Sequence, residues 1–407
     1  MDVLHEHCAG LDVHKATVVA CVRHHDGGRP RREVKQFGTT TRALMEMCDW
    51  LLAEGCTHVV LEATGVYWKP VWHVLEGHFE LLLANAQHVR NVPGRKSDVN
   101  DATWLADLLA HGLVRSSFVP PEPIQQMRDL TRTRKQLTRE IAQHTQRIQK
   151  TLEDANVKLD NVITDILGMS GRRILDAIIA GGHDPVALAS LASPRVKASR
   201  EQLVEALRGK VTDHHRFLLQ QHLTLIEALQ GVVREVEARM GDALAPFRAQ
   251  VEQLMTIPGV KRTTADILAS EIGFDMSRFP TAAHLISWAG LCPRMDESAG
   301  KRRSTRVRKG APWLKTALVQ AAWGAVRKKD SYAGALYRRL QKRGAKKAIV
   351  AVAASLLTAA YHMLRDGTAY RELGANHMDE HKRARLAKSL IRRLTELGLQ
   401  VDVHAAA

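Results

Sequence analysis

Over its first 115 residues the chain alternates short apolar runs with amphipathic segments. The apolar runs have the alternation and β-branched content of strands, and they lie at 8–15, 16–25, 32–38, 57–65 and 79–86. The segments with helical spacing lie at 40–55, 70–78 and 96–114. Strands with intervening helices in this order predict an α/β domain built on a central mixed sheet.

A second pattern begins after the VPPEP stretch (119–123), which marks a boundary. Apolar residues recur at spacings of seven and four from 124 to 167, which predicts one long helix with a narrow seam, as in a coiled coil. These residues are Leu130, Leu137, Ile141, Ile148, Leu152, Leu159 and Ile163. Basic residues crowd the first half of the helix: Arg128, Arg132, Arg134, Lys135, Arg139 and Arg147. Two interpretations stay open, a solvated surface and a dimerisation arm that lies against nucleic acid.

Two or three more helices are expected up to about residue 245, and the rest of the chain is also mostly helical in pattern. Residues 348–364 form a long run without charge, shorter than the ~20 apolar residues that a membrane-spanning helix needs. The run is rich in alanine and contains Ser355, Thr358, Tyr361 and His362. A buried helix of a soluble domain fits it better. The last thirty or so residues predict a basic amphipathic helix of unknown use.

The distribution of charge changes this picture. The 407-residue chain carries a formal net charge of +16 and has a pI near 9.8. Residues 301–350 hold sixteen Lys and Arg and one acid, whereas residues 1–120 hold twelve basic and fourteen acidic residues. So dense a basic segment favours a polyanionic partner, and nucleic acid is favoured over an anionic membrane surface.

Cysteine usage and the N-terminus bear on the compartment. The five cysteines are odd in number and include no CxxC pair, which indicates a reducing cytoplasm without a disulfide framework or a zinc site. The first residues lack the apolar region of a secretion signal. We therefore expect a cytoplasmic, nucleoid-associated protein of the cell interior.

Four acids stand out in the N-terminal third. Asp12 follows an apolar stretch of the first strand, Glu62 lies at the end of an otherwise apolar strand, and Asp98 and Asp101 are spaced for one face of a helix start. A carboxylate beside a buried strand is costly unless a positive charge satisfies it. A divalent cation would do so, and all-oxygen sites suit Mg²⁺ or Mn²⁺. Each acid alone is also explained as a turn residue, a helix cap or a helix N-terminal charge.

The segments GLDVHK, LEATGVYW and KSDVNDATWLA resemble, in order and spacing, the N-terminal domain of the DEDD insertion-sequence transposases. That resemblance implies a RuvC-like, RNase H-like fold. It also implies that Asp12, Glu62, Asp98 and Asp101 form an acidic tetrad that holds Mg²⁺ or Mn²⁺. Asp107, on the same helix, is expected to be a surface residue.

The C-terminal half resembles the same family through IPGV, AGLCP, ESAGK, RKG and LKTALVQAAW, so that the resemblance covers roughly 5–370. Residues 254–273 resemble a helix-hairpin-helix motif, in which Lys261 replaces the usual second glycine. The resemblance implies a serine nucleophile at Ser298, in a stretch expected to be a loop, with Ser304 as the alternative register. The residues expected to bind nucleic acid are Lys261, Arg262, Lys301, Arg302, Arg303, Arg306, Arg308 and Lys309.

Together these features predict four parts: a RuvC-like catalytic domain (1–120), a helical coiled-coil arm (121–245), a C-terminal transposase domain (246–370) and a basic helical tail (371–407). The family implies a DNA recombinase that forms a covalent phosphoserine link, works as a homo-oligomer and is guided by a structured non-coding RNA. The alternative is a metal-dependent endonuclease of the Holliday-junction type, which uses water as its nucleophile.

Overall fold

The structure is a computed structural model of the chain. It describes residues 2–25, 27–63, 65–85, 89, 101–293, 296–298, 301–304, 306–307 and 310–398, and of residues 296–298, 302–303 and 378–384 it describes the backbone alone. The chain divides into two compact units, Met1–Val119 and Pro120–Ala407, which are described here in turn.

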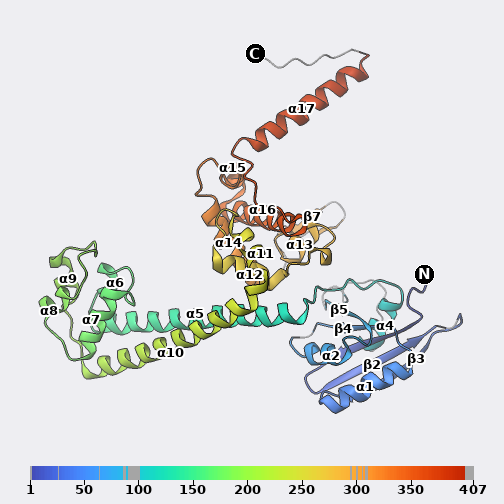
Figure 1. Ribbon diagram of the computed structural model, residues 1–407, viewed down its shortest axis with the longest axis horizontal. Helices are drawn as coiled ribbons and strands as arrows, with labels where there is room; N and C mark the ends of the chain where they lie inside the picture. Colours follow the sequence, from blue (N-terminus) through green and yellow to red (C-terminus); the bar gives the residue numbers. More distant parts are fainter. Residues whose placement is uncertain are drawn as a thin grey trace. The chain divides into compact units, whose positions relative to one another are not determined.

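The N-terminal unit is built on a five-stranded mixed sheet (Figure 1). The strand order is β3-β2-β1-β4-β5; β2 is antiparallel to both of its neighbours, whereas β4 and β5 run parallel to β1. The strands are β1 (His7–Val13), β2 (Thr17–His24), β3 (Arg31–Gly38), β4 (His58–Glu62) and β5 (Glu80–Ala84). The predicted mixed sheet is therefore confirmed, and it is compatible with an RNase H-like domain.

Helices cover both faces of this sheet (Figure 1). On one face, α1 (Thr41–Ala53) and α2 (Trp68–Leu75) bury their apolar sides against alternate residues of β1 and β4, among them Leu11 and Leu61. On the other face, α4 (Asp101–Ala110) packs Leu105 on Val60. Because β1 and β4 are buried on both sides, they are continuous apolar runs in the sequence.

One acid of α4 differs from expectation. Asp107 is half-buried, and its Oδ1 lies 3.1 Å from Nε of Arg23 and 2.9 Å from an Nη atom of Arg32. Arg23 is itself almost fully buried. The expectation of a surface residue is wrong, because a buried arginine needs a carboxylate beside it. Asp107 joins α4 to strands β2 and β3.

The C-terminal unit begins with a long arm. Helices α5 (Glu122–Asp154) and α10 (Asp213–Leu244) lie side by side along it, and shorter helices cap its far end (Figure 1). The shorter helices are α6 (Leu159–Val162), α7 (Met169–Ile179), α8 (Pro185–Ser190) and α9 (Arg200–Ala206). Ile148 and Leu152 of α5 share a core with Leu219 and Leu223 of α10.

The arm differs from the sequence-based prediction in two places. The single helix predicted up to residue 167 ends at Asp154, because Asn156 takes a left-handed backbone conformation with φ of 56°. Leu159 and Ile163, expected on the same seam, instead fill the core at the tip of the arm. Where two or three further helices were expected before residue 245, the structure has five, α6 to α10.

A bundle of shorter helices follows the arm. It contains α11 (Arg248–Met255), α12 (Arg262–Ile272), α13 (Ala282–Trp288), α14 (Pro312–Ala325), α15 (Tyr332–Leu340) and α16 (Ala345–Asp366). By length and composition α16 could cross a membrane, and half of its most apolar window is buried inside the unit. Its buried residues pack against α13, α14 and α15, and the hydroxyl of Tyr361 donates to the carbonyl of Phe279 at 2.9 Å. It is an interior helix of the bundle.

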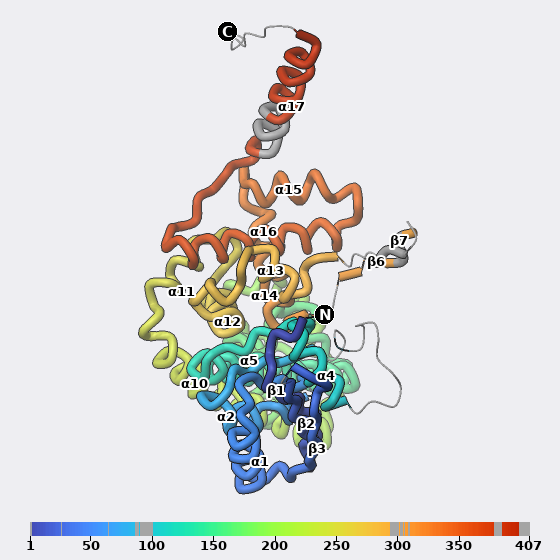
Figure 2. The backbone as a smooth tube through the Cα atoms, turned by 90° about the vertical axis from the view of Figure 1, so that its right-hand side faces the viewer, coloured from blue at the N-terminus to red at the C-terminus, as the bar shows by residue number. Residues whose placement is uncertain are grey.

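Two elements extend from this bundle (Figure 2). One is a hairpin of two antiparallel strands, β6 (Asp296–Ser298) and β7 (Lys301–Ser304). The other is the basic amphipathic helix α17 (His377–Glu396). The stretch around Ser298, expected to be a loop, thus contains a short hairpin.

The arm and the bundle are joined by buried polar contacts. The side chain of Glu271 on α12 is 1% exposed, and its carboxylate receives Arg132 Nε at 2.8 Å and lies 3.5 Å from Arg128 Nε. The hydroxyls of Thr131 and Ser270 lie 3.0 Å apart in the same interface. Burial lowers the pKa of Arg128 to about 10 despite the nearby carboxylate, so the guanidinium stays charged at neutral pH.

Candidate active site and basic surfaces

Two of the predicted tetrad residues lie next to each other on the sheet. Leu11 of β1 pairs with Leu61 of β4 in parallel register, which makes Asp12 and Glu62 neighbours at the ends of adjacent strands. Side chains alternate along a strand, so Asp12 shares the sheet face of Gly10, and Glu62 shares that of Val60. Val60 packs against α4, as does Gly10, so both carboxylates belong to the α4 face.

The start of α4 brings a third acid to this face. A Cβ atom built on Gly10 would lie 2.3 Å from the carbonyl oxygen of Ala102 and 2.4 Å from the amide nitrogen of Ala106. The backbones of strand and helix are therefore in direct contact at this glycine. Asp101, the first residue of α4, precedes this contact by one residue. Asp12 is largely buried and its Oδ2 lies 3.2 Å from Nε2 of His14.

Asp98, the fourth predicted residue, lies outside the described residues. In the part of the chain that the structure describes, no three His, Cys, Asp or Glu side chains are grouped to hold a metal ion. The donors fit Mg²⁺ in kind, because Asp12, Glu62 and Asp101 all offer carboxylate oxygens. Asp12 and Glu62 belong to one face of the sheet, and Asp101 begins the helix that covers this face.

The C-terminal candidates lie on and around the β6–β7 hairpin. Ser298 faces Lys301 across the two strands, and Ser304 faces Asp296. The Ser304 hydroxyl oxygen accepts the backbone N–H of Arg306 at 3.2 Å, so this side chain stabilises its own turn. This hydrogen bond gives the Ser304 side chain a structural role, which does not require it to react with a substrate.

The base of the hairpin is held by close backbone contacts. Pro293 and Val307 form an antiparallel bridge across it. A Cβ atom on Gly310 would lie 2.4 Å from the amide nitrogen of Gly290, so the chain passes backbone against backbone as it enters α14. The hairpin is thereby fixed to the bundle at both of its ends.

The predicted nucleic-acid-binding residues fall into three groups. Lys261, Lys301 and Arg306 are exposed. Arg262 is exposed but donates from Nε to Oδ1 of Asp266 at 2.9 Å, which offsets its charge. The remaining residues have side chains outside the described part of the structure: Arg302, Arg303, Arg308 and Lys309.

The IPGV turn connects α11 and α12. Gly259 has φ of 79°, which favours glycine. A Cβ atom on it would lie 2.1 Å from the carbonyl oxygen of Ala321, so packing on α14 also accounts for this glycine. Gly259, Lys261 and Arg262 are nevertheless exposed on the other side of the turn.

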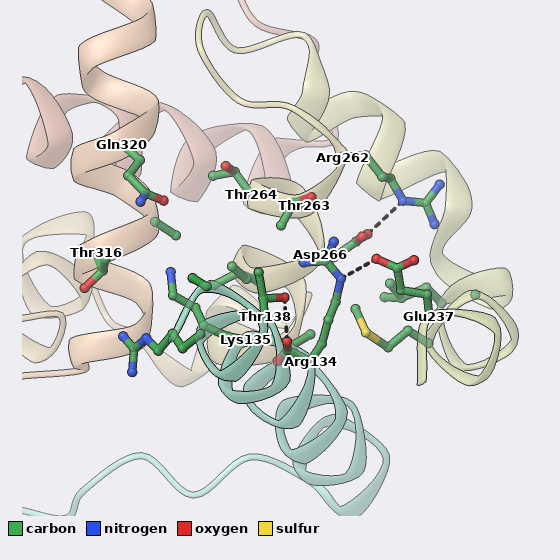
Figure 3. Close-up of a pocket in the computed structure, with 18 residues that line it drawn as sticks. Arg134, Lys135, Thr138, Glu237, Arg262, Thr263, Thr264, Asp266, Thr316 and Gln320 are labelled. Atoms are coloured by element: carbon green, nitrogen blue, oxygen red, sulfur yellow. Dashed lines mark hydrogen bonds and ion pairs between the residues drawn. The ribbon is translucent and has the colours of Figure 1, made fainter. Parts of the chain in front are cut away.

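A basic cavity lies in the C-terminal unit between α5, α10, α12 and α14 (Figure 3). Its volume is about 740 Å³, and its lining includes Arg134, Lys135 and Arg139 of the arm. The sequence places these three residues among the basic residues of a long helix, but it does not indicate that they line a cavity. The residues of the other helices that line the cavity begin at Glu237, about 100 residues further along the chain.

Comparison with known proteins agrees with both halves of this arrangement. A family model for DEDD transposases of the IS110 type, described as a transposase, matches residues 9–157. A second family model, described as the transposase IS116/IS110/IS902 family, matches residues 251–338. The acid-bearing sheet and the helical unit with its hairpin therefore make up a transposase, a class of enzymes that cut and rejoin DNA. Within that class, the chain belongs to the IS110 family of insertion-sequence transposases.

Individual relatives extend this match along the chain. An insertion element IS110 protein of 43.6 kDa from Streptomyces coelicolor is 28% identical over 309 residues, which is 68% of this chain and 73% of the relative. A pilin gene-inverting protein from Moraxella bovis is 23% identical over 383 residues, which is 88% of this chain and 95% of the relative. Human prominin-2 is 28% identical over 137 residues, but only 16% of its length is matched.

Proposed function

We propose that this transposase cuts and rejoins DNA through a covalent link to Ser298, assisted by a divalent cation at the α4 face of the sheet. The observation that carries the proposal is the placement of Asp12 and Glu62 at adjacent strand ends, beside the start of α4. Carboxylate oxygens are the ligands that Mg²⁺ and Mn²⁺ prefer, which is the chemistry that these acids offer. The same face would receive Asp98, three residues before Asp101.

The proposed chemistry keeps the number of phosphoester bonds constant. The Ser298 hydroxyl oxygen attacks the phosphorus of a DNA phosphodiester, and the bond from phosphorus to one sugar oxygen breaks. The serine loses its proton and the released sugar oxygen gains one. Attack by the hydroxyl of another strand reverses the step and frees the serine, so that exchange needs no ATP. A serine hydroxyl is weakly nucleophilic at neutral pH and needs activation.

Asp12, Glu62, Asp98 and Asp101 would hold Mg²⁺ or Mn²⁺. When bound, such an ion supplies Lewis-acid stabilisation of phosphate charge and lowers the pKa of a hydroxyl that it contacts. Cations near the hairpin, such as Lys301 and Arg306, would hold the phosphate and stabilise the charge that develops on it. The acids and the serine belong to different units, so the reaction requires the two units to meet on one DNA, within a chain or between chains of an oligomer.

The partners that we propose are the ends of the element, its target DNA and a structured guide RNA. A basic surface attracts either nucleic acid, and the family match supports DNA as the substrate. The relative from Moraxella bovis is named for the inversion of a pilin gene, and inversion also requires strands to be cut and rejoined. We further propose that the turn before α12 contacts a DNA phosphate and that the protein works as a homo-oligomer. The apolar seam of α5, which predicted a coiled coil, is buried against α10 of the same chain. The compartment would be the bacterial cytoplasm.

The decisive experiment looks for the covalent link. The full-length protein is incubated with DNA carrying an element end, any required RNA from the element, and Mg²⁺, and the products are denatured and resolved by size. We expect a protein–DNA adduct with the wild type and with Ser304→Ala, and none with Ser298→Ala or Asp12→Asn. An adduct that survives Ser298→Ala and disappears with Ser304→Ala would move the nucleophile to Ser304. Cleavage without any adduct would overturn the serine mechanism in favour of a nuclease that uses water.

A further inference from the structure

The basic cavity between α5, α10, α12 and α14 has two ends of different charge. At one end, Arg134 pairs with Glu237 and Arg262 pairs with Asp266, and Figure 3 shows the four side chains together. Two cations facing two carboxylates leave this end close to neutral. The other end lies towards α14, from which Thr316 and Gln320 face the same space (Figure 3).

The α14 end of the cavity is positively charged. Lys135 and Arg139 line it, and neither has a carboxylate partner among the residues that the structure describes. The Arg139 guanidinium lies over the ring of Trp313, 5.2 Å from its centroid, which orients it without offsetting its charge. Burial, and then the charges of Arg139 and Arg134, lower the pKa of Lys135. Among the described residues, the positive charge of Lys135 and Arg139 is therefore not offset by a carboxylate.

The groups at this end are mostly hydrogen-bond donors. Lys135 and Arg139 donate only, and the Gln320 side chain adds an amide. The Thr316 hydroxyl donates to the carbonyl oxygen of Pro312 at 2.7 Å, so its oxygen faces the space as a weak acceptor. An ammonium, a guanidinium and an amide around one space match the oxygens of a phosphate group. A cavity of about 740 Å³ is also within the range of roughly 300–1,000 Å³ that is usual for ligand sites.

We propose that Lys135 and Arg139, together with Gln320, bind the backbone phosphates of a single nucleic-acid strand at the root of the arm. The proposal deepens the function proposed above and rests on it, because it assigns a second nucleic-acid contact to the same enzyme. The ligand chemistry is the phosphodiester, which DNA and RNA share. Phosphate contacts of this kind fix where a strand lies, whereas base contacts specify its sequence.

The position of the cavity indicates how a phosphate contact there would assist the reaction. Thr316 and Gln320 lie on α14, the helix that follows the β6–β7 hairpin. Because Gly310 and Pro293 tie the hairpin to the bundle, a strand held against α14 would be held in fixed relation to the base of the hairpin. The cavity is thus a positioning site on the same helical bundle from which the hairpin with Ser298 extends.

The test measures binding without chemistry. The full-length protein is titrated, in EDTA, into fluorescent single-stranded 20-mers of one sequence made as DNA and as RNA, at several salt concentrations. The double variant Lys135→Gln with Arg139→Gln is compared with Arg173→Gln with Lys197→Gln, which removes the same charge from exposed positions at the tip of the arm. For the cavity variant we expect about tenfold weaker binding and a salt slope smaller by about 0.7 for each phosphate that the protein no longer neutralises. The control variant should bind like the wild type.

Each possible result of this titration either supports or overturns the proposed site. A cavity-specific loss of affinity with RNA alone, with DNA alone or with both supports the site and assigns the strand that it holds. Equal losses of affinity in the two variants would overturn the proposal, because net charge alone would then explain the binding. No loss of affinity in either variant would also overturn it, because the cavity would then contribute nothing to binding. Thermal unfolding of the cavity variant should occur close to that of the wild type, because the relief of repulsion at Lys135 offsets the loss of the Arg139 contact with Trp313. Because no cleavage is needed, a failure here is distinct from the absence of a Ser298 adduct.

Discussion

Two pairs of cations on α5 have the same spacing and opposite surroundings. Arg128 and Arg132 are four residues apart, and Lys135 and Arg139 repeat that spacing seven residues, or about two turns, further along the helix. The first pair surrounds the buried carboxylate of Glu271. The second pair lines a cavity whose two lining carboxylates, Glu237 and Asp266, are paired with Arg134 and Arg262 instead.

The difference comes from the partner helix. Along this face of α5, α12 presents Glu271 to the first pair. The ring of Trp313 lies near both Arg132 and Arg139, and the second pair lines the cavity next to α14. A buried cation that meets its carboxylate within the chain holds the fold together. A cation that lacks one is available to an anion from outside. Basic residues at equivalent positions of one helix therefore stabilise the fold in the first pair and, as we propose, bind a ligand in the second pair.

Removing the internal carboxylate should have the largest effect. We expect Glu271→Gln to lower the free energy of unfolding by about 3–5 kcal/mol, because it leaves Arg128 buried without a counter-charge. Urea denaturation followed by circular dichroism measures the change. Glu252→Gln, at an exposed position on α11, is the matched control and should cost less than about 0.5 kcal/mol. If the two variants lost equal stability, Glu271 would not be the residue that joins arm and bundle.

Adding a carboxylate to the second pair should turn it into a copy of the first. Thr316→Glu places an acid in the cavity beside Lys135 and Arg139, so we expect nucleic-acid binding to fall about tenfold or more while the melting temperature stays level or rises. Thr224→Glu, on an exposed part of α10, adds the same charge elsewhere. If Thr316→Glu bound the same 20-mers as tightly as the wild type, the proposed difference in role between the two pairs of cations would be wrong.

The smallest effect is a pH dependence at the neutral end of the cavity. Burial raises the pKa of Asp266 above its ordinary value of 3.8, and the pairing with Arg262 offsets this only in part. Between the ordinary and the raised pKa the folded chain holds a proton that the unfolded chain has lost, so this group makes stability fall as pH rises. From pH 3.5 upward, the melting temperature of Asp266→Asn should increase relative to that of the wild type at the same pH. A difference between the two proteins that stays constant, or that changes in favour of the wild type, would contradict that sign.

Most of the N-terminal sheet could be predicted from the sequence because its pattern is local. Strands buried on both faces are continuous apolar runs, and Asp12 and Glu62 stand out as charges at the ends of such runs. The pairing of β1 with β4 then makes the two acids neighbours. That Asp107 is tied to Arg23 could not be predicted, because the two residues are 84 positions apart.

The arm was harder to predict for the same physical reason. The left-handed backbone of Asn156 ends α5. The heptad-like spacing of apolar residues nevertheless continues in the sequence beyond this point, so it predicts a longer helix than the one observed. The partner of α5 is α10, which begins almost 60 residues after α5 ends. Nothing in the local sequence separates Arg128, which meets Glu271, from Lys135, which does not. Which charges are neutralised depends on tertiary packing that the helical pattern does not encode.

The close backbone contact at Gly10 implies that the geometry of the acidic site is sensitive to small shifts between strand and helix. The strand that carries Asp12 and the helix that begins at Asp101 touch there with no side chain between them. Even a methyl group would push the helix outward and separate the carboxylates while leaving every one of them in the chain. A shift of about 1 Å is enough to cost an enzyme a hundredfold in rate. In a library selected for transposition, this glycine should therefore tolerate replacement as poorly as the acids themselves.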